Sequence, residues 1–67
     1  MKSVLKVGNI FSGDDVNKIR NIVSQNEGVF ACYINKENKI VEIIYDNYLL
    51  KIDDIIEDIE SLGYFVQ

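Results

Sequence analysis

The chain has 67 residues, which limits it to one domain with a small hydrophobic core. One cysteine and no histidine exclude an internal disulfide and any chemistry that depends on imidazole. A net charge of −4 argues against binding to nucleic acid or to an anionic membrane surface, and no segment is apolar enough for membrane insertion. With no apolar leader at the N-terminus, we expect a single cytoplasmic domain over residues 1–67.

The first half of the chain predicts a strand, a helix and a second strand. Ser3–Val7 is rich in β-branched residues, as strands are. Apolar residues then recur at helical spacing: Val16, Ile19, Ile22 and Val23. Gly28 can adopt the positive φ that follows a helix, and Val29–Asn35 is the second strand.

The second half predicts a hairpin, a helix and a last strand. The polar turn Lys36–Lys39 joins Val29–Asn35 to a third strand, Ile40–Tyr45. A second helix carries an apolar stripe made of Ile52, Ile55, Ile56, Ile59 and Leu62. Lys51 leaves the start of this helix without a capping side chain, and after Gly63 we expect a short strand, Tyr64–Val66.

This order, β-α-β-β-α-β, predicts an α+β domain of the ferredoxin-like plan. Because each βαβ crossover is right-handed, both helices should cover one face of a four-stranded antiparallel sheet. The other face should have no helical cover.

The residues resemble the heavy-metal-associated (HMA) domain of small copper chaperones and metal-transporting ATPases. That family carries a pattern like V-x-G-M-T-C-x-x-C-V, and here the same places read VGNIFSGDDV, from Val7 to Val16. Further echoes are Gly28-Val29, Tyr45-Asp46 and the closing run from Ile59 to Tyr64. The resemblance covers nearly the whole chain and implies the fold derived above.

The metal-binding positions of the family do not match. The two cysteines fall on Ser12 and Asp15, the methionine falls on Ile10, and the preceding glycine falls on Asn9. The family norm is Cu(I), which favours soft thiolate ligands, whereas a hydroxyl and a carboxylate do not suit this ion. We therefore expect no catalytic residue, no confident metal ligand and no cofactor.

Two interpretations of the loop compete. In the first, Ser12 caps the helix and Ser12-x-x-Asp15 is a capping box with aspartate in place of glutamate. In the second, Asp15, together with Asp14, holds a hard cation weakly, although calcium usually requires six to eight oxygen ligands. Capping is the simpler interpretation.

Two hydrophobic side chains are expected beside the loop, and a third, Cys32, is expected in the core away from it. Ile10 and Tyr64 should pack beside it, since they match the methionine and the aromatic residue that lie there in the family. Strand alternation points Cys32 toward the core with Val41 and Ile43, so it should behave as a small hydrophobic residue.

The uncovered sheet face is predicted to be unusually apolar. Alternation places Val4, Tyr33, Ile40 and Ile44 on it. A contiguous apolar patch of this kind suggests an interaction surface, either for a protein partner or for self-association.

We interpret the sequence as an HMA-type domain with a degenerate metal loop that serves as an interaction or accessory module in copper handling. The resemblance makes a metal-transport ATPase a candidate partner. Two alternatives remain open: a metallochaperone with a non-standard site around Ser12–Asp15, and a small-molecule-binding regulatory domain of the same plan. No activated nucleophile or paired base indicates an enzyme.

Overall fold

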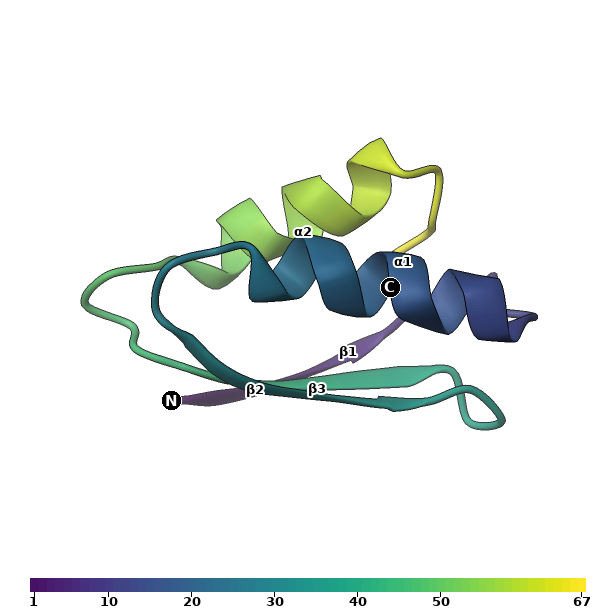
Figure 1. Ribbon diagram of the computed structural model, residues 1–67, viewed down its shortest axis with the longest axis horizontal. Coiled ribbons are helices and arrows are strands. Elements are labelled where there is room, and N and C mark those ends of the chain that lie inside the picture. The colour runs from purple at the N-terminus through teal and green to yellow at the C-terminus, as the bar shows by residue number, and fades with distance from the viewer.

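The computed structural model describes all residues from Met1 to Gln67. Two helices lie on one face of an antiparallel sheet (Figure 1). In chain order the elements are β1 (Lys2–Lys6), α1 (Gly13–Ser24), β2 (Val29–Asn35), β3 (Ile40–Tyr45) and α2 (Ile52–Ser61). The predicted helices, hairpin and arrangement are therefore confirmed.

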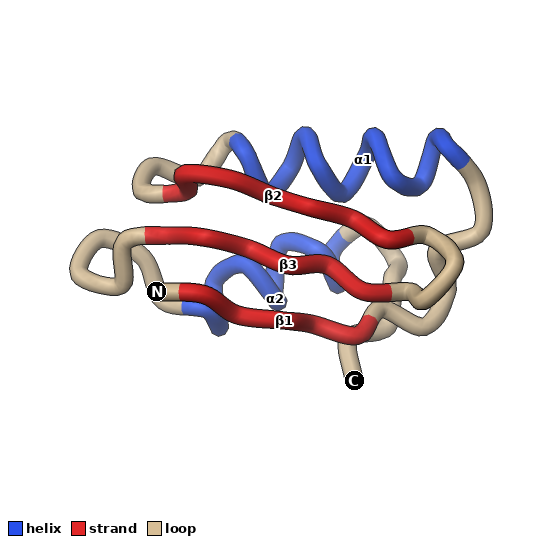
Figure 2. Tube along the Cα trace, turned by 90° about the horizontal axis from the view of Figure 1, so that it is seen from below, coloured by secondary structure: helices blue, strands red, loops and turns tan.

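The sheet has three strands in the order β1-β3-β2, as Figure 2 shows from below. In the β1–β3 pair, Val4 lies opposite Glu42, and in the β2–β3 pair Tyr33 lies opposite the same residue. A bulge interrupts β2 between Val29 and Ala31. The prediction of four strands was wrong, because residues 64–66 form only one isolated bridge, Val7 with Val66.

Asn9 explains why the fourth strand does not form. Gly8 donates its N–H to the Phe65 carbonyl at 2.8 Å, as in an antiparallel ladder. The reciprocal bond would use the Phe65 N–H, but this group donates to Asn9 Oδ1 at 2.8 Å. A side chain thus takes the N–H that would continue the ladder beyond Gly8. Pairing is limited to the Val7–Val66 bridge, which on its other side has a bond from the Gln67 N–H to the Lys6 carbonyl at 2.8 Å.

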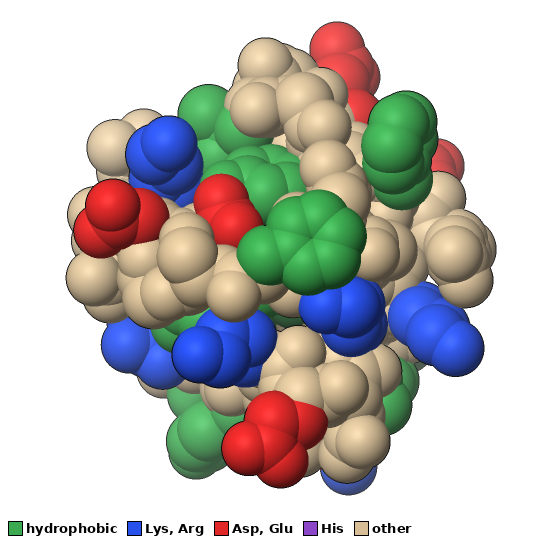
Figure 3. Space-filling view, turned by 90° about the vertical axis from the view of Figure 1, so that its right-hand side faces the viewer, with side chains coloured by type: hydrophobic (Ala, Val, Ile, Leu, Met, Phe, Trp, Pro, Cys, Tyr) green, Lys and Arg blue, Asp and Glu red, His purple; other side chains and the backbone are tan.

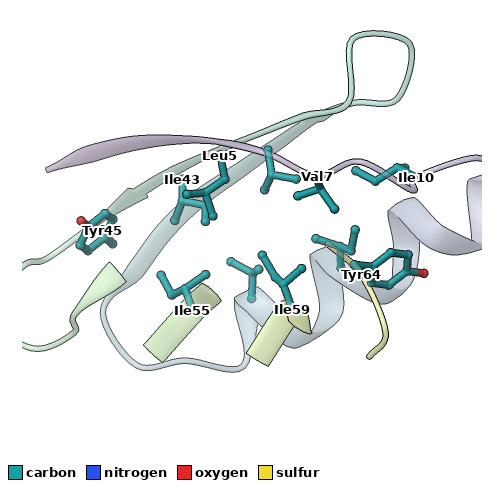
Figure 4. Packing of buried hydrophobic residues seen from close by; sticks show 11 residues of the cluster. Leu5, Val7, Ile10, Ile43, Tyr45, Ile55, Ile59 and Tyr64 are labelled. Atoms are coloured by element: carbon teal, nitrogen blue, oxygen red, sulfur yellow. The ribbon is translucent and has the colours of Figure 1, made fainter. Parts of the chain in front are cut away.

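The core fills the space between the sheet and the two helices (Figure 4). Val41, Ile43 and Tyr45 are buried from β3, and they alternate with half-buried residues that point away from the helices. Each helix buries two residues of its stripe: Ile19 and Val23 from α1, Ile55 and Ile59 from α2. Cys32 packs against this cluster but is half-buried rather than fully enclosed. Burial raises the pKa of its thiol, although the positive charge of Arg20 acts in the opposite direction.

Two turns contain residues with a positive φ, Gly28 and Lys39. Gly28, between α1 and β2, has φ +100°, and a Cβ there would lie 3.2 Å from the Leu49 Cβ, so glycine is required for both reasons. Lys39, at the end of the hairpin turn, has φ 59°, which is unusual for a residue with a side chain.

Neither helix is long and apolar enough to cross a membrane.

Candidate functional site: the loop before the first helix

The loop before α1 is the place where the family pattern and this sequence diverge. It comprises residues 8–12 and meets two segments that are distant in sequence, the hairpin turn and residues 63–65. Figure 3 looks onto this end of the molecule, where lysine and arginine side chains form a band below hydrophobic side chains.

Ser12 caps α1, as predicted. Its side chain accepts a hydrogen bond from the Asp15 N–H at 3.2 Å, and the Asp15 carboxylate accepts one from the Ser12 N–H at 3.1 Å. Both halves of a capping box are present, so the capping interpretation is confirmed. Asp14 and Asp15 lie in the first turn, where the helix dipole favours negative charge.

Asp15 also joins the loop to the C-terminal segment. Its Oδ2 accepts hydrogen bonds from the N–H groups of Ser12 and, at 2.9 Å, Phe11. Its Oδ1 accepts one from the Tyr64 hydroxyl at 2.5 Å. The Tyr64 bond and then the Phe11 bond lower the pKa of Asp15 from 3.8 to about 2, because they stabilise the charged carboxylate.

Tyr64 and Ile10 both lie in the core beneath the loop (Figure 4). Ile10 is fully buried, and Tyr64 is only 7% exposed. The pKa of Tyr64 is raised to about 12, mainly by burial and secondly by the nearby Asp15 carboxylate. The hydroxyl therefore keeps its proton at neutral pH and donates it to the hydrogen bond.

Three contributors to this loop were missed by the sequence analysis: Asn9, Phe11 and Lys39. Asn9 donates to the Gly63 carbonyl and accepts from the Phe65 N–H. Lys39 donates from Nζ to the Ile10 carbonyl at 2.5 Å, and Nζ also lies 4.3 Å from the centre of the Phe11 ring. The replacement of a family glycine by Asn9 was the one available signal, whereas nothing in the sequence placed the hairpin turn beside the loop.

The residues present do not fit Cu(I). Ser12 and Asp15 supply a neutral hydroxyl and a hard carboxylate where the ion favours thiolates, and both side chains already take part in hydrogen bonds. The residues do not fit a hard cation either. No three carboxylate or cysteine side chains lie close enough together to coordinate one. Asp14 makes no hydrogen bond with the other loop side chains, and it does not join Asp15 in a group of metal ligands.

The open sheet face is the second candidate site. Val4, Tyr33, Ile40 and Ile44 all lie on it, because they alternate with or pair beside residues that face the helices. Val4 is 55% exposed and Tyr33 is 59% exposed, while the two isoleucines are half-buried. Lys2 and Glu42 form an ion pair at 2.7 Å across this face. Whether the face binds a partner stays a prediction.

Comparisons with known proteins agree with this architecture. The model of the heavy-metal-associated domain matches residues 4–65, and the chain therefore belongs to that family. No curated protein sequence matches the chain.

Several solved structures are similar over the full length of the chain. A putative copper-ion-binding protein from Bacillus anthracis is 30% identical, with a TM-score of 0.96 and coverage of 100% of this chain and 94% of the other. Apo-CopP from Helicobacter pylori is also 30% identical, with a TM-score of 0.89 and full coverage of both chains. A CopZ metallochaperone has a TM-score of 0.97 at 24% identity with full coverage of both chains, a likeness of fold alone.

Proposed function

We propose that this HMA domain is a metal-independent interaction module that acts in copper handling. The observation that carries the proposal is the use of Asp15. The residue at the second cysteine position of the family pattern accepts three hydrogen bonds from its own chain, so it is committed to holding the loop. The copper-binding relatives support the setting, and the domain itself is expected to act by binding rather than catalysis.

The experiment is competition with a Cu(I) chelator under anaerobic conditions. Four proteins are compared: the natural protein, Ser12→Cys, Asp15→Cys and the double variant. We expect no stoichiometric Cu(I) uptake by the natural protein and little by the single variants, because a two-coordinate Cu(I) site needs two thiolates. The double variant should bind, since the two positions are three residues apart at the helix start and the positive helix end favours thiolates.

Two results would contradict the proposal or part of it. Stoichiometric Cu(I) binding by the natural protein would support a metallochaperone with a non-standard site. Thermal stabilisation of metal-free protein by a small metabolite would support the regulatory alternative instead. If the double variant folds but fails to bind, the loop backbone no longer has the shape of a copper site.

We further propose that the open sheet face binds a protein whose surface has an apolar centre and an acidic rim. Tyr33 and Val4 supply exposed apolar contact area, and tyrosine is frequent among the residues that dominate interface energies. Lys6 lies at the border of the same face, opposite Ile40. Lys36 lies in the hairpin turn directly after β2. Glu42, the one carboxylate on the face, is already paired with Lys2.

The charges on the helical side favour this assignment. α2 carries five carboxylates, Asp53, Asp54, Glu57, Asp58 and Glu60, and no basic residue. The molecule is therefore polarised, with its negative charge concentrated on α2 and the sheet side relatively basic. An acidic partner would approach the sheet side, where the exposed apolar area also lies.

A photo-crosslinking amino acid in place of Tyr33 tests the sheet face in the native host. The captured protein is then purified, and its affinity is measured by calorimetry at low and high salt. We expect Tyr33→Ala to weaken binding at least tenfold and Lys6→Glu to weaken it mainly at low salt. Glu57→Lys, on the opposite side of the molecule, is the matched control and should have no such effect.

Capture of a second copy of this chain would show that the face mediates self-association and does not bind an acidic partner. Sedimentation at high concentration would then show the oligomer directly. Capture of a metal-transport ATPase would identify the partner. Equal effects of the Tyr33 and Glu57 variants would overturn the assignment to the sheet face.

A further inference from the structure

The loop before α1 is tied to the C-terminal segment by two side chains, Asn9 and Asp15. Asn9 bridges the Gly63 carbonyl (3.1 Å) and the Phe65 N–H (2.8 Å), and Asp15 receives the Tyr64 hydroxyl. We call these two side chains and their bonds to residues 63–65 the clasp. It connects positions that are 49 to 56 residues apart in the sequence.

Both clasp residues stand where the sequence departs from the family pattern. Asn9 replaces the glycine of that pattern, and Asp15 replaces its second cysteine. The two replacements are the side chains that form the cross-links to residues 63–65.

We infer that the clasp holds the loop permanently closed without an ion, so that Asn9 and Asp15 are positioning residues for the loop surface. The geometry leaves Asp15 no free role. One carboxylate oxygen faces the Tyr64 hydroxyl, and the other receives the N–H groups of Phe11 and Ser12. Lys39 adds a third tie from the hairpin turn, through the Ile10 carbonyl.

The closed loop fixes one side chain in an outward position. Phe11 is 71% exposed, its N–H is held by Asp15, and its ring lies against the Lys39 ammonium group. A contact residue that is ordered before binding loses less conformational entropy when a partner arrives. The clasp therefore keeps an aromatic side chain presented at this end of the molecule in the absence of metal.

This inference rests on the proposed metal-independent role but is measured separately, by amide hydrogen exchange in isotope-labelled, metal-free protein. The reporters are the N–H groups of Phe11 and Ser12, held by Asp15, and that of Phe65, held by Asn9. Tyr64→Phe removes only the hydroxyl, and Asn9→Gly restores the residue of the family pattern. Tyr48→Phe is the matched control, since Tyr48 is almost fully exposed.

We expect Tyr64→Phe to speed exchange at Phe11 and Ser12 about tenfold, as loss of a hydrogen bond to a charged group would. Asn9→Gly should do the same at Phe65, and Tyr48→Phe should change none of the three. The amides of Ile19 and Val23 in α1 should stay protected in every variant. Addition of Cu(I) to the natural protein should leave the three rates unchanged.

Unprotected exchange at Phe11, Ser12 and Phe65 in the natural protein would overturn the clasp, as would equal rates in the natural protein and Tyr64→Phe. If Tyr64→Phe does not fold, NMR titration of the Asp15 carboxyl in the natural protein decides the matter: a pKa near 3.8 instead of about 2 contradicts the clasp. A protein that bound Cu(I) and kept protected amides would lose the proposed function and retain the clasp, so the two can fail independently.

Discussion

The two helices of this domain begin in different ways, although each follows a strand of the same sheet. α1 begins with a complete capping box at Ser12, and its first turn is bonded through Asp15 to the C-terminal segment. The N-cap residue of α2 is Lys51, whose side chain forms no capping hydrogen bond, as predicted. The loop before α2 has no side-chain hydrogen bond to a distant segment. Its bonds are centred on Asp46, which donates its N–H to the Gly28 carbonyl at 2.8 Å and accepts the Tyr48 N–H at Oδ1 at 2.9 Å.

This difference shows where the sequence concentrates specific interactions. Helix formation alone does not require them, because α2 forms without a cap by burying Ile55 and Ile59. The additional bonds at α1 must therefore serve the position and rigidity of the loop. In the family pattern this is the region of the metal-binding residues, and here hydrogen bonds within the chain hold it.

Truncation of one apolar residue in each loop, Ile10 and Leu49, should give the largest contrast. Ile10→Ala removes a fully buried side chain beneath the first loop and should lower the free energy of unfolding by about 2–5 kcal/mol. Leu49→Ala, in the second loop, removes a side chain that is 63% exposed and should cost less than about 0.5 kcal/mol. Urea denaturation measures both, and similar losses would show that the two helix starts are equally dependent on packing.

The caps themselves should differ by a smaller amount. Ser12→Ala should destabilise the protein by about 1 kcal/mol through loss of the bond to the Asp15 N–H. Lys51→Ala should have almost no effect, and Lys51→Ser should stabilise by about 0.5–1 kcal/mol if the new hydroxyl caps α2. Thermal melts of the three variants check this order, and a stabilising Ser12→Ala would refute the role of the capping box.

The pH dependence of stability should show how much of the effect of Asp15 comes from its negative charge. Its pKa is about 2 in the folded protein and 3.8 as the reference for the unfolded chain. A lowered carboxyl pKa stabilises the folded state fully above the unfolded value and progressively less as the pH falls through the folded value. Natural protein should therefore be more stable than Asp15→Asn at pH 5, and the difference should shrink between about pH 4 and pH 2.

The control for this measurement is Ser12→Ala, which removes a bond without removing a titrating group. Its difference from natural protein should change far less over the same pH range. A difference between natural protein and Asp15→Asn that stayed constant from pH 5 to pH 2 would show that Asp15 is not held as a charged acceptor.

Most of the fold followed from local patterns in the sequence. The stripes of α1 and α2 and the alternation in β3 identified the helices, the hairpin and the face of the sheet that each residue occupies. These features depend on which residues become buried, and burial follows the periodicity of apolar residues. Ser12 and Asp15 were likewise predictable, because a capping box is a local signal.

The contacts between distant segments could not be predicted from local sequence patterns. Tyr64–Val66 has the composition of a strand, but its pairing is decided by the Asn9 side chain, which takes the Phe65 N–H. Similarly, Lys39 acts on Ile10 and Phe11 only because the chain returns the hairpin turn to the loop. Such bonds depend on three-dimensional proximity and leave no periodic trace.

The backbone of Lys39 has a consequence for how this domain could be altered. Its φ of 59° lies in the left-handed region, where a residue with a side chain is less stable than glycine by roughly 1 kcal/mol. Glycine would be the usual occupant of such a turn, and Lys39→Gly should make the hairpin itself more stable. The same change would delete the ammonium group that contacts the Ile10 carbonyl and the Phe11 ring. Lys39→Gly would thus exchange relief of backbone strain in the turn for loss of the contacts that connect the hairpin to the loop.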